Sequence, residues 1–110
     1  MDCMMLQQRL NNYRQGRNCT LLGVGPMSKN CVDATIELAH QYKTPLMLIA
    51  SRRQIDSEQF GGGYVENWST KQFANYVTEK DVGNHIILAR DHGGPWQNEL
   101  EKIQNMDLKD

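Results

Sequence analysis

Three short apolar segments, each followed by a stretch with helical periodicity, restrict the fold of this sequence more than any other feature. The segments are residues 19–24, 46–50 and 86–89, and they are apolar along their length rather than alternating with polar residues. Strands of this kind are typical of a parallel sheet covered on both faces. Parallel strands need crossover connections, so we expect an α/β protein with right-handed crossover helices.

Four segments have the spacing of apolar residues expected of helices: about 2–15, 32–43, 70–83 and 96–103. The predicted order is therefore one helix followed by three strand–helix units, within a single domain covering residues 1–110. The first helix places Leu6, Leu10 and Tyr13 on one face. The predicted helix starts are Ser28 or Asn30 for the second helix, Ser69 or Thr70 for the third, and Pro95 in the first turn of the fourth.

The charge balance and the cysteines restrict the environment and the partners. The 110 residues include 12 Lys and Arg against 13 Asp and Glu, which indicates neither a nucleic-acid-binding surface nor electrostatic attachment to a membrane. The apolar segments are too short to span a bilayer, and the first residues lack the pattern of a secretion signal, so we expect a cytoplasmic protein. The odd number of cysteines, Cys3, Cys19 and Cys31, favours reduced structural thiols, with a reactive Cys31 as the alternative.

Polar residues directly follow the second and third apolar segments. Ser51, Arg52 and Arg53 follow residue 50, and a long loop then continues through three consecutive glycines at 61–63. Long loops at the carboxyl ends of parallel strands often carry function. The glycines could let the backbone approach a phosphate, with Arg52 or Arg53 supplying charge. A flexible loop with solvated arginines is the alternative interpretation.

The third apolar segment leads into Arg90, Asp91 and His92. A carboxylate can transfer a proton and a neutral imidazole can hold a metal ion, so Asp91 and His92 are candidates for these roles. In the alternative, Asp91 caps the next helix or pairs with Arg90. A metal site needs further ligands, and the positions of His40 and His85 do not suit a site that contains His92.

The segments 49–54, 59–64 and 87–95 resemble, in order and spacing, the amino-terminal part of the tagatose-bisphosphate aldolase non-catalytic subunit family. The second reads Gln-Phe-Gly-Gly-Gly-Tyr, and the third ends Asp-His-Gly-Gly-Pro. The resemblance covers about residues 19–96. The chain departs from the family pattern at Gly93 and at the pair Arg52 and Arg53.

The resemblance implies an aldolase-type (β/α)8 barrel from carbohydrate metabolism, related to class II metal-dependent aldolases. It implies that Asp91 is the catalytic proton-transfer acid and that His92 is a ligand of a divalent metal, with zinc the expected ion. The implied substrate is a sugar phosphate, undergoing aldol cleavage or epimerisation, and the implied partner is a catalytic aldolase subunit or a second copy of the chain. The predicted substrate-binding residues are Arg52, Arg53, Gly62, Gly63 and Arg90.

The chain is too short to form a complete barrel. A (β/α)8 barrel has eight strands and about 250 residues, whereas three strands are predicted here. We expect an incomplete barrel with the barrel-facing side of its strands exposed, and no catalytic activity from these residues alone. Two alternatives are a non-enzymatic subunit that stabilises an aldolase complex and a small flavodoxin-like module.

Overall fold

The computed structural model describes residues 4–17, 20–98 and 100–101, and these form an α/β arrangement. The strands make one parallel sheet in the order β1-β2-β3. This confirms the predicted fold class, although a three-stranded sheet does not close into a barrel. In chain order the elements are α1 (Met4–Arg14), β1 (Gly23–Val24), α2 (Lys29–Tyr42), β2 (Leu46–Ser51), the 3₁₀-helix η1 (Glu58–Phe60), α3 (Thr70–Lys80) and β3 (Ile86–Asp91).

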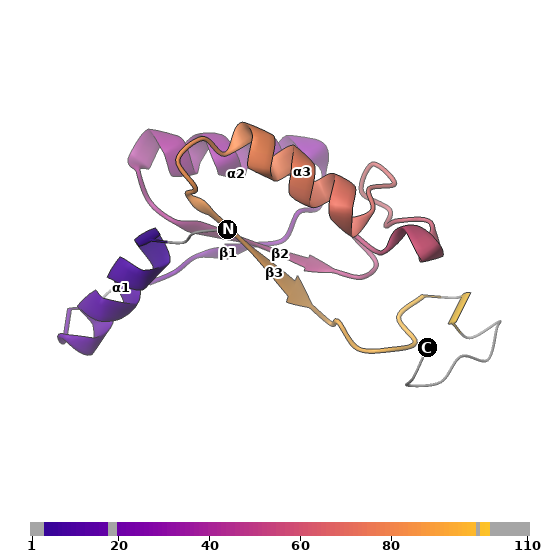
Figure 1. Cartoon of the computed structure of the whole chain (residues 1–110), viewed down its shortest axis with the longest axis horizontal. Helices are drawn as coiled ribbons and strands as arrows, with labels where there is room; N and C mark the ends of the chain where they lie inside the picture. Colours follow the sequence, from indigo (N-terminus) through magenta and orange to yellow (C-terminus); the bar gives the residue numbers. More distant parts are fainter. Residues whose placement is uncertain (1–3, 18–19, 99, 102–110) are drawn as a thin grey trace.

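The two crossover helices, α2 and α3, lie on the same face of the sheet (Figure 1). Consecutive strands are also neighbours in space. In a flavodoxin-like plan, by contrast, the first strand lies between the second and the third, and helices cover both faces. The described strands therefore follow one another in one direction across the sheet, with both crossover helices on the same face.

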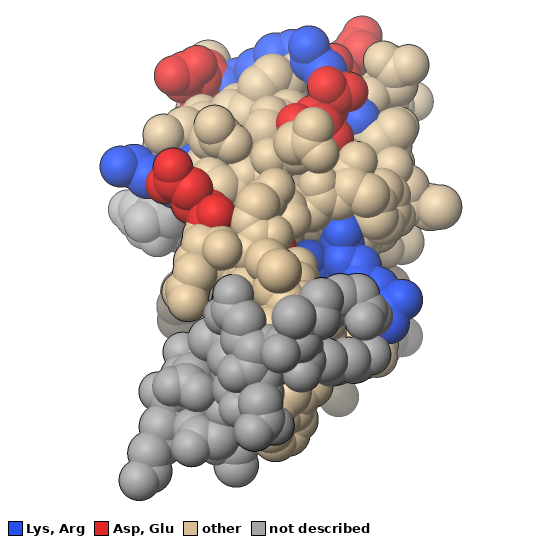
Figure 2. Space-filling view, turned by 90° about the vertical axis from the view of Figure 1, so that its right-hand side faces the viewer, with Lys and Arg blue, Asp and Glu red and all other residues tan. Residues whose placement is uncertain are grey.

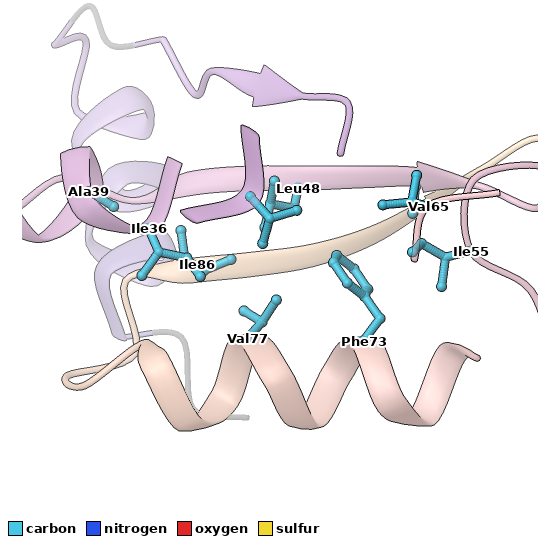
Figure 3. Packing of buried hydrophobic residues seen from close by; sticks show 10 residues of the cluster. Ile36, Ala39, Leu48, Ile55, Val65, Phe73, Val77 and Ile86 are labelled. Atoms are coloured by element: carbon cyan, nitrogen blue, oxygen red, sulfur yellow. The ribbon is translucent and has the colours of Figure 1, made fainter. Parts of the chain in front are cut away.

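The core lies between the sheet and these two helices (Figure 3). Leu48 in the central strand β2 and Ile86 at the start of β3 are fully buried, and Val77 and Phe73 of α3 pack toward them. Burying side chains of this size stabilises the fold by about 1.5–3 kcal/mol each. The complete cluster contains Val32, Ile36, Ala39, Leu48, Ala50, Ile55, Val65, Phe73, Val77 and Ile86.

Two serines fix the starts of the crossover helices. The Ser28 hydroxyl accepts a hydrogen bond of 3.1 Å from the Cys31 N–H at the start of α2. At the start of α3, Ser69 and Gln72 form a reciprocal capping box, with bonds of 3.1 and 3.0 Å. Both caps were among the predicted candidates, and each satisfies N–H groups that the first helical turn leaves unpaired.

Strand β1 is shorter than predicted, because only Gly23–Val24 of the segment 19–24 pairs with β2. Residue 19 lies outside the described part of the chain. A Cβ at position 23 would lie 2.5 Å from the Ile49 Cδ1 atom, so a side chain here would require the end of the Ile49 side chain to move. Leu22, just before the strand, is 56% exposed.

The helix predicted to begin at Pro95 and Trp96 does not begin there. Residues 94–98 are bends and loop, and Trp96 has a φ of +62°, outside the right-handed helical region. Leu100 and Glu101 are helical, and the remainder of the expected helix lies outside the described residues. The strand before it is longer than predicted, because Arg90 and Asp91 remain paired with β2.

The face of the sheet opposite α2 and α3 carries a row of apolar side chains. Side chains alternate between the faces of a strand, so residues adjacent to the buried Leu48 and Ile86 point the other way. These residues pair as Met47 with Ile87 and Ile49 with Ala89 and are only partly buried. We call these four residues the open face. Full coverage of both sheet faces was predicted, and α2 and α3 cover only one (Figure 1).

Helix α1 lies toward the end of the sheet where the strands begin (Figure 1). Arg9 donates a hydrogen bond of 2.9 Å to the Thr44 hydroxyl, just before β2. Leu6, Leu10 and Tyr13 line a shallow cavity of about 160 Å³ together with Leu21, but Leu10 and Tyr13 are 45% and 68% exposed. The predicted apolar stripe is thus present but incompletely covered.

Candidate functional site

The loops that follow β2 and β3 lie at one edge of the sheet. Ser51 and Asp91 are register partners at the carboxyl ends of these strands. A cavity of about 360 Å³ lies beside these loops and is lined by Arg52, Arg53, Gly62, Gly63, Tyr64, Gln97 and Asn98. Four of the five predicted substrate-binding residues therefore share one cavity.

Three lining residues were not predicted as site residues: Tyr64, Gln97 and Asn98. Tyr64 ends the glycine loop that carries the family resemblance. Gln97 and Asn98 were predicted to lie inside a helix. In the structure they lie in a loop, and this loop brings them to the cavity. No sequence motif around these two amide side chains indicates a binding site.

Arg52 is held in an internal network. Its Nε and one terminal nitrogen lie 3.2 Å from the two carboxylate oxygens of Asp56, and it lies 2.5 Å from Glu101. It also donates a 3.0 Å bond to the Gly94 carbonyl and stacks 5.0 Å from the centre of the Phe60 ring. The bond to Glu101, followed by that to Asp56, raises the pKa of Arg52 above its ordinary value. Arg52 thus ties the two loops together, with its charge matched by carboxylates.

Glu101 completes this connection from the other side. Its carboxylate accepts hydrogen bonds from the N–H groups of Trp96, at 2.7 Å, and Asn98, at 3.2 Å. The bond from Arg52, followed by these backbone bonds, lowers the pKa of Glu101 below its ordinary value. Glu101 therefore holds the segment 96–98 against the loop after β2 while it is ionised.

Arg53 differs from its neighbour because its side chain is exposed. Its carbonyl oxygen accepts a 2.9 Å bond from the Tyr64 N–H, which fixes the backbone at this point of the loop. Among residues 4–17, 20–98 and 100–101, no hydrogen bond or ion pair of the Arg53 guanidinium is found. The positive charge of Arg53 is therefore available at the cavity.

The glycines make close contacts within the loop itself. A Cβ at Gly62, where φ is +75°, would lie 2.3 Å from the Asn67 carbonyl oxygen. A Cβ at Gly63 would lie 1.9 Å from the Gln54 carbonyl oxygen. The N–H of Gly62 donates to Ser57 and that of Gly63 to Trp68, each at 3.1 Å. These amides already have partners, so the glycines shape the cavity wall rather than present free donors.

Asp91 and His92 form an exposed pair at the end of β3. His92 Nδ1 lies 2.9 Å from an Asp91 carboxylate oxygen, and the side chains are 70% and 54% exposed respectively. His92 has a φ of +48°, which turns the chain sharply after the strand. The resemblance implies a divalent metal at His92, but a metal centre needs at least three protein ligands. No third ligand joins this pair among the described residues, so these residues do not by themselves form a metal centre.

Arg90, the fifth predicted substrate-binding residue, is bonded to the protein backbone and to α3. One terminal nitrogen donates to the carbonyls of Ala50, at 3.3 Å, and Ile55, at 2.5 Å. The other donates a 3.0 Å bond to the Thr70 hydroxyl at the start of α3. These bonds fasten the loop after β2 to the first turn of α3, and Arg90 does not line the 360 Å³ cavity.

The surface at this end of the molecule carries both signs of charge. In the part of this face that is not drawn in grey, Figure 2 shows basic and acidic side chains beside one another rather than one continuous basic surface.

Comparison of the chain with protein-family models, with curated proteins and with solved structures found no match. In the described part of the chain, no helix has both the length and the apolar character needed to cross a membrane. A functional interpretation must therefore start from the geometry of the side chains themselves.

Proposed function

We propose that this chain is the amino-terminal part of an aldolase-type β/α barrel that binds a sugar phosphate at the carboxyl edge of its sheet. The observation that carries the proposal is the cavity of about 360 Å³ between the loops after β2 and β3. It combines an uncompensated Arg53 with tyrosine and amide side chains, which suit a phosphate and sugar hydroxyls respectively. The consecutive strand order, with both helices on one face, supports a barrel-type plan over a doubly wound one.

In this proposal Arg53 contacts the phosphate, while Tyr64, Gln97 and Asn98 contact the sugar. Arg52 acts indirectly, because its bonds to Asp56 and Glu101 hold the two loops that form the cavity. Gly62 and Gly63 give the wall its shape. The odd number of cysteines further favours the reducing cytoplasm as the location.

The described residues are proposed to bind without turnover. Asp91 and His92 stand open to solvent, where general acid catalysis gains little from a low dielectric. Class II aldol chemistry also depends on a metal, for which His92 lacks companion ligands within the described ranges. Asp91 as a catalytic acid thus belongs to a more complete protein.

Isothermal titration calorimetry with tagatose 1,6-bisphosphate and with inorganic phosphate tests this proposal. Arg53→Gln should weaken binding about tenfold or more, the size of one lost charge-assisted hydrogen bond. Arg14→Gln is the matched control, because Arg14 is an exposed arginine on α1, toward the opposite end of the sheet. Equal loss in both variants, or no binding by the unmodified chain, would refute a phosphate site at the cavity.

A second candidate function is that of a non-enzymatic subunit that stabilises an aldolase complex. The open face favours it, since four partly buried apolar side chains lie on the side of the sheet that α2 and α3 leave uncovered. Adjacent apolar strands with no cover are a common basis for association. In this function the partner, either a catalytic subunit or a second copy, packs against β2 and β3.

Sedimentation velocity tests this second function. Ile87→Lys should abolish association, whereas Leu38→Lys should not, because Leu38 lies on α2 and is already 46% exposed. The double variant Asp91→Ala and His92→Ala should associate normally if assembly is the function. An unmodified chain that stays monomeric at all concentrations, alone and with a catalytic aldolase subunit, would contradict this candidate.

A further inference from the structure

A cluster of three potential metal ligands lies at the opposite end of the sheet, where the strands begin. His40 comes from the last turn of α2, Asp81 follows α3, and His85 precedes β3. One ligand atom from each lies within 4.8 Å of the other two. His40 Nε2 is 2.7 Å, and His85 Nδ1 is 4.0 Å, from the same carboxylate oxygen of Asp81.

The Asp81 carboxylate is buried and held in place by the backbone. Its side chain is 4% exposed, and its oxygens accept hydrogen bonds from the N–H groups of His85, at 3.0 Å, and Ile86, at 2.8 Å. Backbone donors of this kind orient a metal-binding carboxylate and fix its rotamer. The helix ends and the strand start that carry the cluster are thus part of the rigid fold.

A role in stabilising the turn accounts for the backbone hydrogen bonds of Asp81. It does not account for the surroundings of the His85 side chain. The Nδ1 atom of His85 is buried and has no hydrogen-bond partner within the described residues. Gly83 lies against this ring edge, where a Cβ would approach to 2.9 Å from Cε1 and 3.2 Å from Nδ1. A buried polar atom without a partner is costly, and this one lies 4.0 Å from a carboxylate oxygen that already contacts a second imidazole.

We propose that His40, Asp81 and His85 bind a zinc ion or a similar divalent transition metal. Two imidazoles and one carboxylate are ligands that Zn²⁺ commonly accepts, with water as the fourth. Zinc bonds of about 2.0–2.1 Å at tetrahedral angles separate neighbouring ligand atoms by about 3.3 Å. The His40 contact with Asp81 would lengthen and the His85 contact with Asp81 would shorten, each by less than about 1 Å. The two imidazole nitrogens, which lie within 4.8 Å of each other, would close by up to about 1.5 Å.

The ion would join α2 to the turn between α3 and β3. This is far from the carboxyl ends of the strands, so the site is independent of the sugar-phosphate cavity and of the pair Asp91 and His92. The expected ligand is the metal alone, in a stabilising role. The sequence does not reveal this cluster, because His40 on α2 is distant in sequence from Asp81 and His85 in the turn between α3 and β3.

Zinc titration by calorimetry and Co²⁺ absorption spectroscopy test the proposal. Both use a chain in which Cys3, Cys19 and Cys31 are serine, so that thiols do not compete. We expect one Zn²⁺ per chain and the visible bands of tetrahedral Co²⁺. His40→Gln and His85→Gln should each weaken binding by more than the roughly 10–100-fold cost of losing a supporting partner.

His92→Gln is the matched control, since it removes an exposed histidine at the other end of the sheet and should leave binding unchanged. Circular dichroism identifies any variant that fails to fold, and His85→Gln then serves in place of His40→Gln. The proposal is overturned if the cysteine-free chain with all three ligands binds zinc no more tightly than His40→Gln and His85→Gln in the same background. It is also overturned if only His92→Gln reduces binding.

Discussion

The glycine loop offers a matched pair of substitutions that separates backbone conformation from close packing. Gly61 has a φ of +81°, with open space around its Cβ position. Gly63 has no such dihedral restriction, but a Cβ would lie 1.9 Å from the Gln54 carbonyl oxygen and 2.4 Å from the Ile55 nitrogen. Alanine therefore meets only a conformational cost at Gly61 and only a steric cost at Gly63.

The two costs have different sizes. A left-handed conformation costs a non-glycine residue about 1–2 kcal/mol, which is the loss expected for Gly61→Ala. Overpacking costs about 1–3 kcal/mol and sometimes more; backbone atoms cannot rotate away, so Gly63→Ala should lose at least about 3 kcal/mol. Each kcal/mol lowers the Tm of a domain of this size by roughly 4–8 °C.

Urea unfolding followed by tryptophan fluorescence measures both losses. Trp68 is a suitable reporter because its carbonyl oxygen accepts the Gly63 N–H. Gly63→Ala should also abolish phosphate binding, whereas Gly61→Ala, outside the cavity lining, should preserve it. If Gly63→Ala destabilised the protein no more than Gly61→Ala, the packing of the loop described here would be wrong.

Further substitutions test other parts of the structure. Ser69→Ala removes the capping box of α3 and should lower the free energy of unfolding by about 1 kcal/mol, measured by urea titration. Leu48→Ala empties the fully buried centre of the sheet and should cost about 2–5 kcal/mol in the same assay. Glu101 has a lowered pKa in the fold, so its bond to Arg52 stabilises the protein above the ordinary pKa of 4.5 and is lost as the pH falls below it. Fluorescence should report this acid transition, and Glu101→Gln should remove it. Arg90→Met should reduce stability while leaving calorimetric phosphate binding intact; a selective loss of binding would restore its predicted substrate role.

The order of strands and helices could be predicted from the sequence, because apolar runs and helix caps are local sequence signals. The apolar runs 46–50 and 86–89 became β2 and β3, and the predicted caps Ser28 and Ser69 start α2 and α3. The segment after Pro95 was mispredicted because Glu101 binds the N–H groups of its first residues in a loop conformation. The same carboxylate contacts Arg52, which is distant in sequence.

The candidate site was predictable only in part, because local sequence signals identify a loop but not the contacts that its side chains make. Arg52, Arg53 and the glycines could be identified as one loop, but their separate roles could not. Only the fold shows that Asp56 and Glu101 neutralise Arg52 and leave Arg53 as the uncompensated charge. The cluster of His40, Asp81 and His85 was beyond sequence reasoning, because it depends on how α2 packs beside the start of β3.

Binding of a sugar phosphate at the carboxyl edge of the sheet is the central claim, and an amide NMR titration tests it most directly. On addition of tagatose 1,6-bisphosphate, we expect the largest shifts at the amides of residues 53, 62–64 and 97–98, and little change at His40, Asp81 and His85. Absence of shifts at saturating ligand, or shifts confined to the end of the sheet where the strands begin, would contradict the proposed function.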